Sequence, residues 1–392
     1  MLDDLGALRI AGADASRFLQ GQLSNDLGRL GAQRSMLAGL HNPQGRTIAL
    51  LRIVQLAPDD LLALLPRELA APVAARLSKY VLRAKVKVSD DSASWRIRGL
   101  IASGLGGAAE LRSGDAAPEP LAGFPAAMGE QRRLADTLAI CVGEQPARWL
   151  LITPATQAGQ SNTDAAVHFD APQCVAAGRE VWRQLDIIAG LPQVYGATSE
   201  AFVAQMLNLD LVGAIAFDKG CYTGQEVIAR AHYRGRVKRR LQRFRSRRSL
   251  DLKPGDDGEL ADGRAFTVVD AVCLEDGHCE FLAVAPLPEP ELSATAAPDA
   301  MLERVSAPLA AHASQLGATA LTRANVGAPA TGTALHAAMP AELTTTGAVW
   351  APFASSPGGP RRAPSAALPP SLAEALPHEI ERLDLPYALP GT

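Results

Sequence analysis

Residues 218–241, DKGCYTGQEVIARAHYRGRVKRRL, form the stretch of this chain that is most informative about its fold and its chemistry. A Gly-Cys pair is followed by a second glycine, Gly224, and then by a run of basic side chains. The residues after Gly224, from Gln225 to Ala231, are predicted to begin a helix. Cys221 is therefore expected in a tight loop before a helix N-terminus, with Lys219 two residues earlier.

This setting favours a reactive thiol at Cys221. The positive end of a helix dipole and a nearby lysine both stabilise a thiolate, and so lower the pKa of a thiol. Such a cysteine serves as a nucleophile, as a redox centre, or as a ligand to a metal or cluster. The alternative is a small residue that fills a turn. The remaining cysteines have no comparable setting and are predicted to pack in the core: Cys141, Cys174, Cys273 and Cys279.

Basic side chains dominate the positions that follow the cysteine. From Arg230 to Arg248 there are eleven of them, counting His232, and no acid lies between Glu226 and Asp251. A patch of this kind binds RNA phosphate, the glutamate tail of a folate, or an acidic protein partner. The alternative is a solvated strand edge whose arginines prevent edge-to-edge pairing.

The whole chain is nearly neutral and long enough for several domains. Its 392 residues include 38 Lys and Arg against 41 acidic residues, which gives a net charge of −3 and excludes a wholly basic nucleic-acid coat. No apolar stretch approaches the ~18–20 residues of a membrane span, and Met1–Asp4 lacks the pattern of a signal peptide. Five cysteines without a C-x-x-C pair do not form a disulfide framework or a zinc ribbon. We expect a soluble, reduced, cytoplasmic protein with no membrane partner.

The periodicity of apolar residues predicts an α+β chain. Strands are expected over residues 47–56, 61–65, 84–88, 95–101, 149–153 and 379–385, and helices over residues 66–81 and 199–207. They mix without a strict βαβα alternation, which argues against a doubly wound sheet. No G-x-G-x-x-G or Walker A pattern occurs, which excludes the standard nucleotide-binding folds.

The octet KGCYTGQE at residues 219–226 resembles the signature of the YgfZ folate-binding family. Members of this family are relatives of the glycine-cleavage T-protein (aminomethyltransferase) and are linked to iron–sulfur cluster maintenance and tRNA modification. Further matching segments are QGQLSND at 20–26, NPQGR at 42–46, AGLP at 189–192, QMLNL at 205–209, YRG at 233–235, KR at 238–239 and LPY at 385–387. The resemblance covers roughly residues 3–290 and the last dozen.

The resemblance implies a three-domain ring of the T-protein type, with a central folate channel and a C-terminal β-barrel-like domain. Residues 1–240 would form the folate-binding region as two interleaved α+β subdomains, and residues 241–290 with 378–392 the C-terminal β-domain. Residues 291–377 are rich in Ala and Pro and poor in aromatic anchors. They are predicted to be a flexible insertion.

The resemblance also implies the site residues. Cys221 and Lys219 would perform the chemistry. Tetrahydrofolate would be bound by Trp182, Tyr222, Gln225, Glu226, Arg230 and Arg234, and no metal site is implied. An indole face stacks well on a pterin ring. On the residues alone, a single Trp in an apolar stretch is a core residue.

Three departures from the family pattern concern the ligand. Ile188 stands where members often have an acid that pairs with the pterin, although Asp186 lies two residues earlier. Leu5 occupies a position where some members have a tryptophan. The segment 41–46 has no acid, and Cys221 stands where aminomethyltransferases have an Asp, which argues against glycine-cleavage chemistry.

Three functions remain open from the sequence. The first is a folate-binding accessory protein that supports iron–sulfur cluster assembly or repair and, through iron–sulfur enzymes, tRNA modification. Its partners would be folate, iron–sulfur enzymes or assembly proteins, and tRNA, and it need not be an enzyme in the usual sense. The second is a folate-dependent one-carbon (aminomethyl) transferase. The third is a tRNA-binding protein that uses the basic run at residues 230–248.

Overall fold

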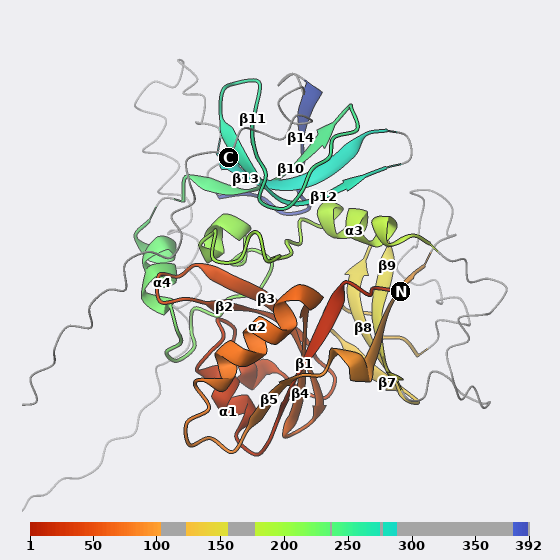
Figure 1. The fold of residues 1–392 in the computed structure, drawn as a ribbon, viewed down its shortest axis with the longest axis vertical. Helices are drawn as coiled ribbons and strands as arrows, with labels where there is room; N and C mark the ends of the chain where they lie inside the picture. Colours follow the sequence, from red (N-terminus) through yellow and green to blue (C-terminus); the bar gives the residue numbers. More distant parts are fainter. Residues whose placement is uncertain (103–122, 156–176, 236, 275–276, 288–378, 391–392) are drawn as a thin grey trace, which may run out of the picture. The chain divides into compact units, whose positions relative to one another are not determined.

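The structure is a computed structural model that describes residues 1–102, 123–155, 177–235, 237–274, 277–287 and 379–390. All of them belong to one compact unit, formed by Met1–Glu289 together with Ala367–Thr392. The predicted insertion 291–377 lies outside the described residues, and the division of the chain into domains stays a prediction. Figure 1 shows three sheets joined by short helices and loops.

The first sheet has five antiparallel strands in the order β2-β3-β4-β1-β5. They are β1 (Leu5–Ala11), β2 (Met36–His41), β3 (Thr47–Ala57), β4 (Asp60–Pro66) and β5 (Lys87–Asp90). The helix α1 (Ala15–Gln20) follows β1, and α2 (Arg67–Ser78) packs against β1, β4 and β5. The predicted strands 47–56 and 61–65 are thus confirmed, and the predicted helix 66–81 is confirmed but ends earlier.

The continuous apolar run of β4 reflects burial on both faces of the sheet. Leu61 and Leu65 belong to the large core under the helices, whereas Leu62 and Leu64 belong to a second core shared with the neighbouring sheet. Side chains alternate between the faces of a strand, so a strand covered on both sides needs apolar residues at every position.

The second sheet has four antiparallel strands in the order β6-β9-β8-β7. They are β6 (Trp95–Ile101), β7 (Gln131–Leu134), β8 (Thr137–Glu144) and β9 (Ala147–Pro154). The helix α3 (Arg179–Ile188) packs on this sheet through Trp182, which shares a core with Ile97, Leu150 and Ile152. The predicted strands 95–101 and 149–153 are confirmed.

The third sheet has five antiparallel strands in the order β11-β12-β13-β10-β14. They are β10 (Arg239–Ser246), β11 (Asp257–Glu259), β12 (Ala265–Cys273), β13 (Cys279–Pro286) and β14 (Ile380–Leu383). Strand β14 confirms that the segment 379–385 returns to the fold. The order has two free ends, so the described strands do not close into the implied barrel.

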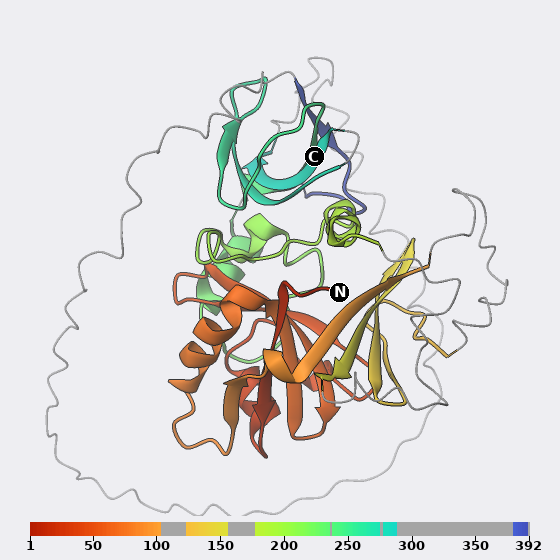
Figure 2. The ribbon, with the colours of Figure 1, turned by 45° about the vertical axis from the view of Figure 1, so that its right-hand side comes forward.

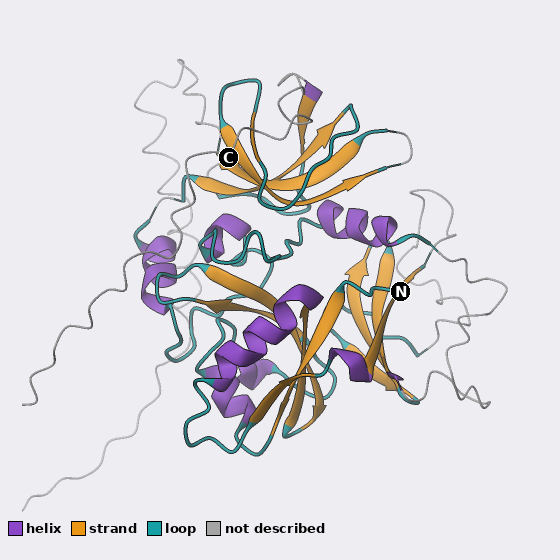
Figure 3. Cartoon of the chain, viewed as in Figure 1, coloured by secondary structure: helices purple, strands orange, loops and turns teal. Residues whose placement is uncertain are grey.

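The segment between α3 and α4 (Gln225–Tyr233) is mostly loop, as Figure 3 shows. The helix predicted over 199–207 is wrong, since only the short 3₁₀ helix η5 (Ala204–Leu207) forms there. Its first half is a turn whose backbone bonds to the start of β3: Glu200 N–H donates to Thr47 O at 2.8 Å, and Thr47 N–H donates to Phe202 O at 2.8 Å. Backbone groups used between segments are not available for a helical turn.

One pair of cysteines differs from the prediction that all would simply pack. Cys273 and Cys279 lie opposite each other on β12 and β13 and form a disulfide. They are six positions apart in the sequence, and the hairpin places their Cα atoms 4.0 Å apart. Cys141 is buried and free, as predicted, and Cys174 lies outside the described residues.

Two further findings concern the described part of the chain. None of its helices has both the length and the apolar composition required to cross a membrane. Nor do its His, Cys, Asp and Glu side chains gather in a group of three or more suited to a metal ion.

Candidate functional site

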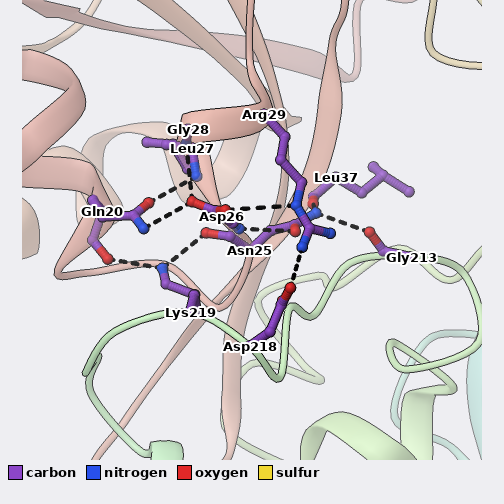
Figure 4. A network of polar contacts seen from close by, with 10 residues as sticks. All are labelled: Gln20, Asn25, Asp26, Leu27, Gly28, Arg29, Leu37, Gly213, Asp218 and Lys219. Atoms are coloured by element: carbon purple, nitrogen blue, oxygen red, sulfur yellow. Dashed lines mark hydrogen bonds and ion pairs between the residues drawn. The ribbon is translucent and has the colours of Figure 1, made fainter. Parts of the chain in front are cut away.

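Lys219 of the octet holds the N-terminal loop in place. Its ammonium group donates to the backbone carbonyls of Gln20 at 2.8 Å, Leu23 at 2.6 Å and Asn25 at 2.8 Å, as Figure 4 shows in part. An ammonium has three N–H donors, so all of them are used here. Burial lowers the pKa of Lys219 to about 8, which leaves the group mostly charged at pH 7. These contacts give Lys219 a structural role, and its predicted part in the chemistry stays a prediction.

The same loop is closed by a second set of polar contacts (Figure 4). The Asp26 carboxylate accepts from Gly28 N–H at 3.0 Å and from the Gln20 amide at 2.9 Å. These donors hold the pKa of Asp26 below its usual range. Arg29 lies between Asp26 and Asp218, at 3.5 and 2.5 Å, and so ties the loop to the residue before Lys219. The QGQLSND segment and the octet are therefore two halves of one structure.

Two glycines allow the octet to approach the segment 42–46. Gly224 is the N-cap of α4 with a φ of 82°, and a Cβ added there would lie 2.5 Å from the carbonyl oxygen of Asn42. Gly45 has a φ of 71°, and its Cβ would lie 2.9 Å from Val227 on α4. Both positions exclude a side chain for conformational and steric reasons. Cys221 is thus presented on a loop that this contact fixes, and its thiol is free and exposed.

Beneath this loop lies a buried histidine that the sequence gave no reason to single out. His41 ends β2, and neither of its ring nitrogens has a hydrogen-bond partner among the residues that the structure describes. Burial lowers its pKa to about 3, so the ring is neutral. The centroid of the Tyr222 ring lies 6.3 Å from that of His41 and 5.1 Å from the Lys219 ammonium. A buried, unpartnered imidazole next to the octet is visible only in three dimensions.

Trp182 lies in the wall of a cavity of about 40 Å³. The cavity is lined by Leu5, Leu37, Leu50, Arg52, Leu64, Leu65, Val142, Leu150, Trp182, Asp186, Leu191 and Gln193. One side of the indole packs on Gly99, where an added Cβ would lie 2.3 Å from the ring. The Arg148 guanidinium lies 5.2 Å from the ring centroid. Leu5 and Trp182 share this cavity, although 177 positions separate them in the sequence.

Asp186, and not Ile188, places its side chain in the wall of this cavity. It lies one helical turn after Trp182, on the same face of α3, and both line the cavity. Ile188 does not line it. Arg148 donates to Asp186 at 2.6 Å, and both side chains are buried. Burial raises the pKa of Asp186 and lowers that of the neighbouring Arg52 to about 10.

Three further family segments, AGLP, QMLNL and LPY, are joined by hydrogen bonds around Asn208 and Tyr387. The Tyr387 hydroxyl donates to Gly190 O at 2.7 Å and accepts from the Asn208 amide at 3.3 Å. Asn208 also accepts from Arg240 at 3.2 Å, and Arg240 forms a bidentate pair with Asp210 at 3.0 and 2.9 Å. The AGLP, QMLNL and LPY segments therefore hold the fold together, and of their residues only Leu191 lines the cavity.

The remaining predicted folate residues lie elsewhere. Tyr222 is buried, and Gln225 accepts from the Tyr222 N–H at 3.3 Å. Glu226 and Arg230 are exposed on α4, and Arg234 is exposed at its C-cap. None of these five lines the cavity. Figures 1 and 2 show α3 and α4 well apart, with the loop segment between them. The structure brings Trp182 together with Asp186 and Leu5, and Tyr222 together with Lys219 and His41.

Comparison with solved structures identifies the fold. The crystal structure of glycine cleavage system aminomethyltransferase T from Bartonella henselae matches with a TM-score of 0.56 at 16% identity, over 73% of this chain and 77% of that one. The chain thus has the fold of the glycine-cleavage T-protein class, as predicted.

Comparison with curated proteins identifies the family. The tRNA-modifying protein YgfZ of Edwardsiella ictaluri (strain 93-146) is 33% identical over 292 residues, which cover 72% of this chain and 82% of the relative. That of Escherichia coli O157:H7 (strain EC4115 / EHEC) is 31% identical over 281 residues, with 71% and 82% covered. No family model matches the chain. The chain belongs to the YgfZ family, which confirms the resemblance carried by the octet.

Proposed function

We propose that this protein binds a tetrahydrofolate in the Trp182 cavity and supports iron–sulfur enzymes, or the proteins that assemble their clusters, in the modification of tRNA. The observation that carries the folate part is the pairing of Trp182 and Asp186 on one face of α3, both in the wall of one cavity. The tRNA part rests on the membership of the YgfZ family, whose curated relatives are named tRNA-modifying proteins.

The residues of the cavity fit the chemistry of a pterin. The Trp182 indole offers an aromatic surface for stacking, and the Asp186 carboxylate accepts hydrogen bonds from an amino edge. Arg52 is a buried donor on the same cavity. A space of about 40 Å³ holds only a few waters, so binding requires the cavity to widen, for example by movement of Leu5 and Leu191.

Within this proposal the two regions have separate tasks. A bound tetrahydrofolate supplies a reduced ring system that carries one-carbon units. The cavity residues bind and orient it and exclude water from it. Cys221, exposed on the loop before α4, is the reactive thiol that meets the client protein. An exposed thiol is accessible to a partner in a way that the buried Cys141 is not.

Titration of the purified full-length protein with tetrahydrofolate tests the ligand. We expect quenching of tryptophan fluorescence that is absent in Trp182→Phe. Asp186→Asn should bind about ten- to hundredfold more weakly, because a charged hydrogen bond is worth ~1.5–3 kcal/mol. Ile188→Glu is the matched control and should not tighten binding, because Ile188 lies outside the cavity wall. A titration that shows no quenching and no heat, at millimolar tetrahydrofolate and low salt, would remove folate from the proposal.

A further inference from the structure

The basic run at residues 230–248 divides into two parts with different roles. The arginines of β10 are engaged within the fold: Arg240 with Asp210, and Arg243 and Arg245 with Glu280, at 2.6 and 2.9 Å. Arg239 donates to the carbonyls of Ala265 and Val284, so all four arginines of the strand half are engaged within the fold. Arg230 on α4, Arg234 at its C-cap and Lys238 beyond it are exposed, and their side chains form no ion pair or hydrogen bond with other described residues.

Two aromatic side chains of the same segment, His232 and Tyr233, form a ring cluster with Phe217. Phe217 and His232 are nearly parallel, with ring centroids 3.7 Å apart and an interplanar angle of 17°. Tyr233 packs edge-on against both, at 4.7 Å from His232 and 6.1 Å from Phe217. Phe217 is partly buried and packs against the large core under the helices, whereas Tyr233 is 67% exposed. Among the described residues, no other large apolar side chain except Leu82 is as exposed.

Stacked rings next to unpaired cations suit an unpaired nucleotide. A base has an apolar face that stacks on an aromatic side chain and a phosphate that pairs with Arg or Lys. An acidic peptide would use the cations but has no planar group for the rings. A duplex would present phosphates but keep its bases stacked inside.

We propose that Phe217, Arg230, His232, Tyr233, Arg234 and Lys238, here called the α4 surface, bind single-stranded RNA. Bases stack on Tyr233 and His232, and the three cations contact the flanking phosphates. This inference deepens the proposed function and rests on it for the choice of RNA as the partner. It does not involve the Trp182 cavity, because no residue of the α4 surface lines that cavity.

Fluorescence anisotropy tests the rings, with the full-length protein and a labelled single-stranded RNA of about 12 nucleotides as the probe. We expect Tyr233→Ala to weaken binding about five- to a hundredfold and Tyr233→Phe to bind like the wild type, because stacking needs the ring and not the hydroxyl. Tyr80→Ala is the matched control, since Tyr80 is 49% exposed on a different element and should not matter. Equal affinity of Tyr233→Ala and the wild type would overturn the proposal, and so would an equal loss in Tyr80→Ala.

The salt dependence tests the cations. Lys238→Gln should lower the slope of log affinity against log salt by about 0.7, the value for one phosphate contact on a single strand. Two results together would assign the surface to an acidic protein and contradict the proposal. Polyglutamate would displace the RNA, and Tyr233→Ala would bind the RNA as tightly as the wild type does. Asp186→Asn should keep its affinity for RNA, so failure of the folate proposal is distinguishable from failure of this one.

Discussion

At the scale of single residues, the two described cysteines that are not in the disulfide offer a matched comparison. Cys221 is exposed on the loop before α4, whereas Cys141 is buried in β8. Burial raises the pKa of the Cys141 thiol, which keeps it protonated and unreactive. Replacement by serine should therefore affect stability at Cys141, which serves packing, and function at Cys221, which serves chemistry.

Cys221→Ser is expected to abolish function in cells and to leave the melting temperature nearly unchanged. Cys141→Ser should lower the melting temperature, because it places a hydroxyl in an apolar core. In a background with Cys174 replaced by serine, thiol labelling of the native protein should modify Cys221 first. Full complementation of a deletion strain by Cys221→Ser would contradict a chemical role for this thiol.

His41 makes a prediction about pH. Its pKa is about 3 in the fold and near 6.5 when unfolded, so below pH 6.5 the unfolded chain binds more protons and the free energy of unfolding falls. Between pH 6.5 and 5 this amounts to about 2 kcal/mol. His41→Leu, which removes no hydrogen bond, should lose this part of the pH dependence in urea denaturation. An unchanged pH slope would show that the imidazole is not held neutral.

At the scale of elements, the start of α4 depends on its close approach to the segment 42–46. Gly224 has a left-handed conformation and faces the Asn42 carbonyl, whereas Gly220 in the same octet has open space around it. Two glycines four residues apart thus serve different purposes. Only the tertiary contact distinguishes them.

Gly224→Ala should lower the free energy of unfolding by about 1–3 kcal/mol, through strain at positive φ and a clash with backbone that is fixed at both ends. Gly220→Ala is the matched control, and we expect it to change stability by no more than about 0.5 kcal/mol. Urea denaturation of the two variants measures both. Similar changes in the free energy of unfolding for the two variants would mean that the loop adjusts to a side chain and that its geometry does not require Gly224.

At the scale of the molecule, residues from distant parts of the chain close the structure through Tyr387. Its hydroxyl links Gly190, which follows α3, to Asn208, which in turn bonds to Leu241 and Arg240 on β10. The return of the chain as β14 places this tyrosine. The C-terminal strand is therefore part of the support for the region between α3 and α4.

Tyr387→Phe is expected to lower the free energy of unfolding by about 1–3 kcal/mol. The buried Asn208 amide and the Gly190 carbonyl would each lose a hydrogen-bond partner. Tyr233→Phe removes the same hydroxyl from an exposed ring and should be neutral. Thermal or urea unfolding compares the two. A neutral Tyr387→Phe would show that the three segments are held together by packing alone.

The sequence by itself determined much of the local structure and the family. The alternation and length of apolar runs predicted strands such as 47–56 and 95–101, because the order of apolar and polar residues follows the side-chain period of a strand. The octet and its companion segments indicated the T-protein fold. An acid within reach of Trp182 was also visible, as Asp186.

Tertiary structure alone decided which residues share a site. Helical periodicity in 199–207 was overridden, because β3 takes the backbone groups of Glu200 and Phe202. Lys219 stands two residues from Cys221, yet its ammonium is directed at three carbonyls of the N-terminal loop. The basic run looked continuous, but Asp210 and Glu280 form ion pairs with three arginines of its strand half. Each outcome depends on partners far away in the chain, and local pattern carries no information about those partners.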